Sequence, residues 1–306
     1  MEISTILTQL AEEKLIPSAN WKWTAMAGGT MSEVFLLQPE TGRPVVIKIN
    51  EAKVTKAEAD FLSVYSSLSL LPKLVAVDSE YRFMAYTYLP GSTGYPSDSS
   101  KKELLQALVS GLINRYQPAS SIEDWGWQEA PVKSWQQFLM EEVQTAEEIL
   151  IPYLKKKNLR IASPPAKGKT YNLHKSAPYL IHGDCGVHNF IFREKRLAGI
   201  IDPTPVLGWP HYDVIYAFFS TPHELTKETL DAAFKGFTLP LPDRQQFYKE
   251  VLIGLYQRLA ICVKHHPEDF HAYLQAWRHW EEIVDSEPPS NNESEKGNSP
   301  ISSDKL

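Results

Sequence analysis

The amino-acid sequence predicts an α+β protein in two lobes: a small antiparallel sheet at the N-terminal end, then a larger and mainly helical C-terminal lobe. Short runs of β-branched and aromatic residues, separated by Gly, Pro and Asn, dominate the first 90 residues. Beyond them, apolar residues recur at the three- and four-residue spacing of helices. Of the 306 residues, 43% are hydrophobic and 22% charged, so the chain has enough apolar surface for a folded core.

We expect the N-terminal lobe to span residues 1–90 and the C-terminal lobe 91–286, with a disordered tail over 287–306. The lobe boundary is placed at Pro90 and Gly91, which interrupt the strand pattern. The tail consists largely of Ser, Asn, Pro, Lys and Glu. It lacks the apolar surface that would offset the entropy lost on ordering.

In the N-terminal lobe, three strands joined by tight turns come first, and a helix over 55–68 and two more strands follow. Thr55 is the expected N-cap of this helix, and Phe61 and Leu62 lie on its buried face. The five strands are expected at 21–26, 33–37, 44–49, 74–78 and 82–89.

In the C-terminal lobe, helical spacing predicts helices over 102–115 and 133–151, the second ended or kinked by Pro152. The Lys- and Pro-rich stretch 156–178 has no sustained period and is expected to be a surface loop. Short apolar runs then predict three strands, and three or four helices follow within 211–285. These strands are expected at 179–182, 190–193 and 197–201.

Composition and charge exclude several classes of function. The formal charge is −6, with 31 Lys and Arg against 37 Asp and Glu, and no long basic tract favours binding to nucleic acid. No run of about 18 apolar residues predicts a membrane span, and Met1–Gln9 lacks the features of a secretory signal. We therefore expect a cytoplasmic protein. Its two cysteines, Cys185 and Cys262, are expected to be free thiols.

The most informative motif is H-x-D-x-x-x-x-N, formed by His182, Asp184 and Asn189 between two apolar runs. This is the spacing of the kinase catalytic loop, in which the Asp accepts the proton of the substrate hydroxyl and the Asn holds Mg²⁺. A further carboxylate, Asp202, ends a short strand thirteen residues after Asn189. Because Mg²⁺ prefers a few oxygen ligands together with phosphates and waters, Asn189 and Asp202 are the predicted metal ligands.

The N-terminal lobe supplies matching parts in the expected order. A turn containing Gly28, Gly29 and Ser32 lies between two strands, where its backbone could approach phosphates. Lys48 lies in the apolar third strand as the predicted phosphate-binding lysine, and Glu58 on the following helix is its predicted partner. Because the turn is not G-x-G-x-x-G, it contributes little on its own.

Over residues 20 to 285, the sequence resembles the aminoglycoside phosphotransferase family. The shared features are a Gly-Gly-x-x-Ser turn, a Val-Ile-Lys strand, a Tyr-Leu-Pro-Gly hinge end at 88–91, the His-Gly-Asp-x-x-x-x-Asn loop, an Ile-Ile-Asp segment and Gly-x-Pro-x-Tyr-Asp at 208–213. The stretch 179–222 is similar to the hygromycin and streptomycin phosphotransferases. One departure is Pro203, where many members carry an aromatic residue after the metal-binding Asp.

The resemblance implies a protein-kinase-like fold with ATP, or GTP, between the lobes, Thr87 and Leu89 among the nucleotide-binding residues, Mg²⁺ at Asn189 and Asp202, and Asp184 as the base. It implies transfer of a phosphoryl group to a hydroxyl of an aminoglycoside-like, sugar or amino-alcohol acceptor.

Two alternatives stay open: a housekeeping kinase acting on a fructosamine, choline or homoserine-like substrate, and a catalytically silent kinase-like binding protein. A protein kinase is disfavoured, because the segment after Asp202 is too short for a substrate-docking activation loop. The oligomeric state and the role of the 156–178 loop stay open.

Several nearby residues have simpler interpretations. His182 is expected to organise the loop, Asp213 to support it or to cap a helix, and Cys185 and His188 to be exposed loop residues without a role. The aromatic rings at 125 and 127 could stack on a sugar or pack internally, whereas the one at 135 begins a helix stripe and is assigned to the core.

Overall fold

The computed structural model describes residues 2–16, 21–26, 32–40, 42–96, 98–119, 124–164 and 177–287. The chain forms two compact units. The first comprises Met1–Glu141 and His174–Leu239, and the second comprises Glu142–Leu173 and Pro240–Leu306. The lobe boundaries expected at residues 90 and 286 stay predictions, and the expected tail after residue 287 lies outside the described residues.

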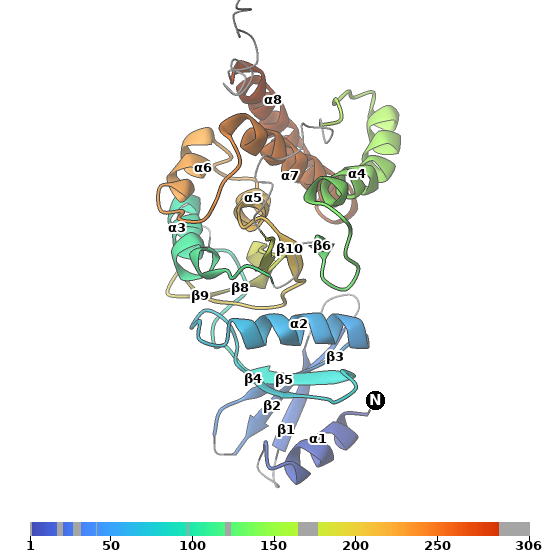
Figure 1. The fold of residues 1–306 in the computed structure, drawn as a ribbon, viewed down its shortest axis with the longest axis vertical. Coiled ribbons are helices and arrows are strands. Elements are labelled where there is room, and N and C mark those ends of the chain that lie inside the picture. The colour runs from blue at the N-terminus through green and yellow to red at the C-terminus, as the bar shows by residue number, and fades with distance from the viewer. Residues whose placement is uncertain are drawn as a thin grey trace, which may run out of the picture. The chain divides into compact units, whose positions relative to one another are not determined.

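The N-terminal sheet has five antiparallel strands in the order β1-β2-β3-β5-β4 (Figure 1). All five predicted strands are confirmed. Their register places Val34 of β2 and Met84 of β5 on either side of Lys48 in β3, so these three side chains share one face of the sheet. The strands are β1 (Trp21–Met26), β2 (Glu33–Pro39), β3 (Val45–Ile49), β4 (Leu74–Val77) and β5 (Phe83–Thr87).

Helix α1 (Ile3–Glu12) covers the opposite face of this sheet and was not predicted. Its fully buried Ile6 and Leu10 join a core cluster with one set of alternating strand residues: Leu37, Val45, Ile47, Phe83 and Ala85. Since successive strand residues point to opposite faces, this packing leaves the other face to Lys48 and its neighbours.

Helix α2 (Ala52–Val64) lies on the face of the sheet opposite to α1 (Figure 1), where its Glu58 contacts Lys48. It begins three residues before the predicted start, because the Thr55 N–H already donates to the Glu51 carbonyl at 2.9 Å. The expected N-cap role of Thr55 is therefore wrong: Thr55 lies within the first turn and is buried. Phe61 and Leu62 are buried as predicted.

The remainder of the first unit combines short sheets with helices. Strands β6 (Gly126–Trp127), β10 (Val206–Gly208) and β7 (Tyr179–Ile181) form one sheet in that order, and β8 (Phe190–Arg193) pairs with β9 (Arg196–Ile200). The strands β7, β8 and β9 are confirmed, whereas β6 and β10 were not predicted. The helices are α3 (Lys101–Gly111), α5 (His211–Phe219) and α6 (Lys227–Phe234), with 3₁₀ turns η1 (Ile113–Arg115) and η2 (Val187–Asn189).

A buried lysine fixes the C-terminal end of α5. The Nζ of Lys101, the first residue of α3, donates to the carbonyls of Phe218 at 2.9 Å and Thr221 at 2.8 Å. Carbonyls at a helix C-terminus lack partners within the helix and carry partial negative charge, so a buried ammonium is stabilising there. Helix α5 is thereby anchored at the end opposite to Asp213.

In the second unit, α7 (Arg244–His265) packs against α8 (Phe270–Ser286) through aromatic contacts such as Tyr256 with Trp277. Helix α4 (Trp135–Lys157) starts in the first unit and ends in the second. It continues past Pro152 and ends with three lysines, which favour a helix C-terminus.

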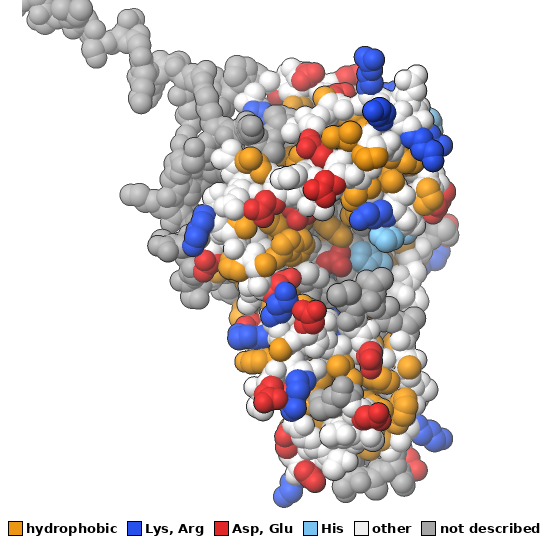
Figure 2. All heavy atoms as spheres, turned by 90° about the vertical axis from the view of Figure 1, so that its right-hand side faces the viewer, with side chains coloured by type: hydrophobic (Ala, Val, Ile, Leu, Met, Phe, Trp, Pro, Cys, Tyr) orange, Lys and Arg blue, Asp and Glu red, His pale blue; other side chains and the backbone are white. Residues whose placement is uncertain are grey.

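Within the described residues, no helix combines the length and the apolar character needed to cross a lipid bilayer. The expected cytoplasmic location stays a prediction. On the face drawn in Figure 2, acidic and basic side chains of the described residues are interspersed rather than gathered into one large patch of either sign.

Candidate active site

The N-terminal sheet and the strand pair β8–β9 meet at a buried lysine. Lys48 Nζ donates to Glu58 Oε2 at 2.7 Å and to Asp202 Oδ1 at 3.3 Å. Glu58 comes from α2 and Asp202 lies two residues after the end of β9 at Ile200, so residues of three separate segments converge on one ammonium. The structure thus brings three of the predicted site residues into direct contact.

Burial and charge compete in this cluster. Burial alone would lower the pKa of Lys48, but the carboxylates of Glu58 and Asp202 outweigh it and the pKa of Lys48 is raised. Lys48 therefore keeps its positive charge at neutral pH. Asp202 is the more accessible carboxylate, with 34% of its side chain exposed against 1% for Glu58. Asp202 can therefore turn its second oxygen towards a ligand while the buried Lys48–Glu58 pair stays intact.

The predicted metal ligands Asn189 and Asp202 are brought close by the pairing of β8 with β9. The Ile201 N–H donates to the Asn189 carbonyl at 2.9 Å, which continues the ladder to the residue before Asp202. Asp202 has a φ of +54°, in the left-handed region that costs a non-glycine residue about 1 kcal/mol. The surrounding structure therefore holds Asp202 in a strained backbone conformation.

The Asn189 amide leaves one atom for a cation. Its Nδ2 donates to the Asp184 carbonyl at 3.0 Å and to Asp184 Oδ2 at 2.9 Å. These two bonds occupy the nitrogen, and the amide oxygen Oδ1 is the atom available for coordination. One amide oxygen and the Asp202 carboxylate form the hard oxygen donor set that Mg²⁺ takes together with phosphate and water oxygens, so the residues present fit this ion.

The two oxygens of Asp184 differ in their surroundings. Oδ2 accepts the Asn189 bond and faces His188 Nε2 at 3.3 Å, whereas Oδ1 is buried and has no hydrogen-bond partner. Burial acts to raise the pKa of Asp184, but His188 and the Tyr216 hydroxyl outweigh it, so the pKa of this carboxyl is lowered. Asp184 is therefore ionised at neutral pH.

A second buried carboxylate holds the start of the catalytic loop. Asp213 of α5 accepts hydrogen bonds from the His182 N–H at 2.9 Å, the Gly183 N–H at 3.0 Å and the Tyr116 hydroxyl at 2.6 Å. Burial raises the pKa of Asp213 to about 6 despite these donors. The supporting role expected for Asp213 therefore has a clear geometric basis.

His182 is a neutral scaffold residue. Its Nε2 donates to the Ile201 carbonyl at 3.1 Å and its Nδ1 accepts from the Asp184 N–H at 3.2 Å. The carbonyl can only accept, which assigns the proton to Nε2. Burial lowers the pKa of His182 to about 4, so the ring stays neutral at pH 7. His182 thus ties the residue before Asp202 to the backbone of Asp184.

Gly183 permits a close approach of two backbone segments. Its φ is +81°, and a Cβ at this position would lie 1.9 Å from the Thr204 carbonyl oxygen. The Thr204 N–H also donates to the His182 carbonyl at 2.9 Å. No other residue type fits, because any side chain would clash with backbone and require a disfavoured conformation.

Helix α2 is fastened to the same region by Tyr65, the residue that follows its last turn. The Tyr65 hydroxyl donates to the Leu180 carbonyl at 2.5 Å and accepts from the Gln117 N–H at 2.9 Å. Phe61 packs edge-on against the His182 ring at 5.7 Å between centroids. The helix that carries Glu58 is therefore linked to the strand that leads into the catalytic loop.

Apolar side chains surround Lys48 on its face of the sheet. The register places Val34, Leu36, Val46, Met84 and Tyr86 on this face, and the last three are buried. A lysine ammonium beside a mainly apolar wall suits a ligand with a flat apolar part and an anionic part.

The other residues predicted to bind a nucleotide lie around this face or outside the described residues. Thr87 ends β5, and its hydroxyl accepts from the Lys73 N–H at 2.9 Å. Leu89 is half-buried over Gly199 of β9. Ser32 precedes β2 and is half-buried, without a described contact to Lys48. The turn containing Gly28 and Gly29 falls outside the described residues.

The burial of the loop residues and of the tryptophans agrees only in part with the sequence-based expectations. His188 is exposed as expected, but Cys185 is fully buried, because the loop turns its thiol inward towards Tyr116 and Asp213. Trp135 is in the core as predicted, and the half-buried Trp125 packs against it.

The half-buried Trp127 packs edge-on against Phe138 at 5.6 Å. The ring faces at 125 and 127 are therefore engaged at least partly in internal packing.

Three tyrosines of this site were missed by the sequence analysis. Tyr65 and Tyr116 bridge backbone and carboxylate groups, and Tyr216 approaches Asp184 from α5. No local sequence pattern distinguishes a tyrosine whose hydroxyl makes a hydrogen bond from one whose ring is only buried.

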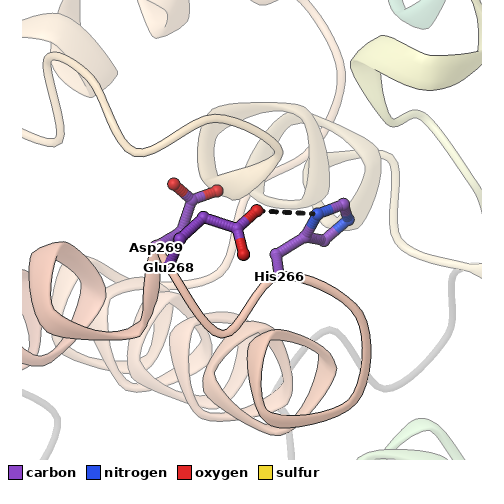
Figure 3. Close-up of side chains that lie close together, drawn as sticks. All are labelled: His266, Glu268 and Asp269. Atoms are coloured by element: carbon purple, nitrogen blue, oxygen red, sulfur yellow. Dashed lines mark ion pairs between the residues drawn. The ribbon is translucent and has the colours of Figure 1, made fainter.

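A separate cluster of His266, Glu268 and Asp269 lies between α7 and α8 in the second unit (Figure 3). His266 Nδ1 and Glu268 Oε1 are 3.9 Å apart, and both side chains are exposed. The Asp269 N–H donates to the His266 carbonyl, so the cluster is a polar turn before α8.

Comparison with known proteins gives one family and a set of related folds. The family model described as "Phosphotransferase enzyme family" matches residues 22–249. No curated protein matches the chain in sequence.

Among solved structures, the choline kinase of Cryptosporidium parvum is 11% identical with a TM-score of 0.58, covering 93% of this chain and 97% of its own. The amicoumacin kinase hAmiN, in complex with AMP-PNP, Ca²⁺ and amicoumacin, is 16% identical with a TM-score of 0.53, covering 93% and 94%. The aminoglycoside phosphotransferase APH(4)-Ia, with AMP-PNP and hygromycin B, is 14% identical with a TM-score of 0.50, covering 92% and 98%. These likenesses confirm the predicted kinase-like fold.

Proposed function

The chain belongs to the phosphotransferase enzyme family, and from this premise we propose that it transfers the terminal phosphoryl group of ATP or GTP to a hydroxyl of a small molecule. The observation that carries the proposal is the convergence of Lys48, Glu58 and Asp202 next to the Asp184–Asn189 pair. Phosphoryl transfer needs positioned charges more than covalent chemistry, and this cluster supplies charges of both signs.

In this proposal, Lys48 contacts the phosphates and Glu58 keeps its ammonium in place. The buried pair at 2.7 Å fixes the direction of the long lysine side chain before the nucleotide arrives. The apolar face around Val46 and Tyr86 takes the base of the nucleotide. Thr87 and Leu89 at the end of β5 are proposed to border the base, and the glycine turn with Ser32 to border the phosphates.

Asn189 Oδ1 and the Asp202 carboxylate would hold Mg²⁺. A divalent ion at these residues neutralises charge on the phosphate oxygens. The Asp202 carboxylate also touches Lys48 at 3.3 Å. This contact supports a site in which Lys48 and the ion would act on the same phosphates.

Asp184 orients the acceptor and takes its proton. The Asp184 side chain is 27% exposed although its Oδ1 is buried, so an acceptor hydroxyl can donate to the exposed part of the carboxylate. This bond directs the oxygen of the hydroxyl towards the terminal phosphoryl group. Because the pKa of Asp184 is lowered, it acts mainly by orientation at neutral pH and receives the proton late.

The acceptor is proposed to be an amino sugar or amino alcohol, including aminoglycoside-like compounds. The names of related structures support this class, since hygromycin B is bound by one of them and choline kinase is another. A housekeeping metabolite and an antibiotic are equally compatible with the site itself, because the residues described above contact only the nucleotide and the reacting hydroxyl.

The first test measures Mg²⁺-dependent release of ADP or GDP over a panel of amino sugars, aminoglycosides and amino alcohols. We expect Asp184→Asn to lower turnover by a factor of about 10²–10⁴ while nucleotide binding is retained. Asp98→Asn, at an exposed ion pair with Lys195, is the matched control and should leave the rate unchanged.

Turnover that survives Asp184→Asn would refute the assigned base. A wild-type chain that binds neither nucleotide nor Mg²⁺ in a thermal-shift assay would instead support the catalytically silent alternative.

A further inference from the structure

The exposed histidine of the catalytic loop contacts the proposed base. His188 lies on η2 with 57% of its side chain exposed, yet its Nε2 is 3.3 Å from Asp184 Oδ2. An exposed histidine four residues after a carboxylate need not point back at it. Here it does, and the motif H-x-D-x-x-x-x-N does not include this position.

The contact depends on a glycine in between. A Cβ on Gly186 would lie 2.3 Å from His188 Cε1 and 2.5 Å from His188 Nδ1. The imidazole is therefore folded over the bare Cα of Gly186. The φ and ψ of Gly186 are −88° and 155°, an extended conformation that any residue can adopt. The backbone conformation therefore does not require a glycine at this position.

We propose that His188 is a positioning residue of the phosphoryl-transfer reaction, which fixes the orientation of the Asp184 carboxylate through its contact with Oδ2. This inference rests on the proposed function. A carboxylate can rotate about its Cβ–Cγ bond and exchange its two oxygens. Asn189 and His188 both contact Oδ2, and two contacts on one oxygen oppose that rotation.

Asn189 alone is a weaker anchor once it coordinates a cation. Its amide plane must then serve both the metal ion through Oδ1 and Asp184 through Nδ2. His188 supplies a second contact from the solvent side, where the acceptor must enter. The Tyr216 hydroxyl of α5 also hydrogen-bonds to the Asp184 carboxyl. Asp184 is thereby contacted by side chains of the loop and of α5.

The test compares His188→Ala, His188→Gln and Gly186→Ala. We expect His188→Ala to lower kcat about ten-fold, with unchanged KM and binding affinity for the nucleotide and an unchanged melting temperature. His188→Gln, which keeps a side-chain N–H, should recover part of the loss. Gly186→Ala should reproduce the loss with the imidazole still present, because the new methyl group displaces the ring. His223→Ala, at an exposed histidine of the first unit, is the matched control.

Three outcomes would overturn the inference: a kcat for His188→Ala within two-fold of wild type, an equal loss in His223→Ala, or a loss explained by weaker nucleotide binding in calorimetry. Asp184→Asn separates this failure from that of the proposed function. If Asp184→Asn abolishes turnover and His188→Ala does not change it, only the positioning role falls. If the wild type shows no turnover on any acceptor, the proposed function fails first.

Discussion

The two ends of the catalytic loop are held in different ways. At the inner end, His182 and Gly183 donate their backbone N–H groups to Asp213, and all three residues are buried. At the outer end, His188 makes a single 3.3 Å contact from an exposed position. The loop thus passes from core to surface over residues 182–188, and the proposed base Asp184 lies between its two ends.

Because of this difference, the inner end is expected to determine the stability of the fold and the outer end the rate of the proposed reaction. At the inner end, removing a partner leaves buried polar groups without hydrogen bonds, which costs free energy of folding. At the outer end, water replaces any lost contact, so a substitution changes the geometry of Asp184 and little else. We therefore expect substitutions at the inner end to lower the free energy of unfolding, and substitutions at the outer end to lower the rate of phosphoryl transfer.

The largest effect is expected for Asp213→Ala. It removes the shared acceptor of the His182 and Gly183 N–H groups and of the Tyr116 hydroxyl. At about 1–3 kcal/mol for each buried donor left unsatisfied, we expect a loss of about 4 kcal/mol in the free energy of unfolding. Urea denaturation followed by circular dichroism measures it. A loss below about 1 kcal/mol would mean that the inner end contributes no more to stability than the outer end does, and would contradict this comparison.

Gly183→Ala is expected to cost about 3 kcal/mol. Its methyl group would meet the Thr204 carbonyl oxygen at 1.9 Å in a backbone conformation with φ of +81°. Gly236→Ala is the matched control, because a Cβ there meets nothing within 4 Å. Equal urea midpoints for the two variants would contradict the close approach of the two segments at Gly183.

The smallest expected effect is a change in the pH dependence of stability at His182. Its pKa is lowered to about 4 in the folded protein, so below pH 6.5 the unfolded state binds the proton more readily. Stability contributed by the neutral ring is therefore present above pH 6.5 and is lost as pH falls towards 4.

We expect the difference in unfolding free energy between wild type and His182→Gln to shrink by about 2 kcal/mol from pH 7.5 to pH 5. Urea titrations of both proteins across this range measure it, and the titration of other groups cancels in the comparison. A difference independent of pH would mean that the His182 ring is not buried in neutral form.

Much of the fold was predictable because its signals are local. The five N-terminal strands follow from β-branched runs between turn residues, and Lys48 stands out as a charge within such a run. Helix α1 was not predicted, although Ile3, Ile6, Leu7 and Leu10 have helical spacing. Strands β6 and β10 have two and three residues, which is too short for any period to appear.

The supporting residues of the site were harder to foresee because their partners are distant in sequence. Tyr65 bonds to Leu180 and Tyr116 bonds to Asp213. Neither contact produces a recognisable pattern in the sequence around either residue. The burial of Cys185 has the same cause. A cysteine within a polar loop suggests exposure, and only the tertiary position of α5 and Tyr116 turns it inward.

The attachment of Tyr65 has a consequence for inhibitor design. A compound that must push α2 outward to enter would have to break the bonds of Tyr65 with Leu180 and Gln117. At a net value of about 1 kcal/mol each, this costs such a compound roughly 30-fold in affinity. Compounds that occupy the apolar face beside Lys48 and leave α2 in place avoid this penalty, and screening should begin with them.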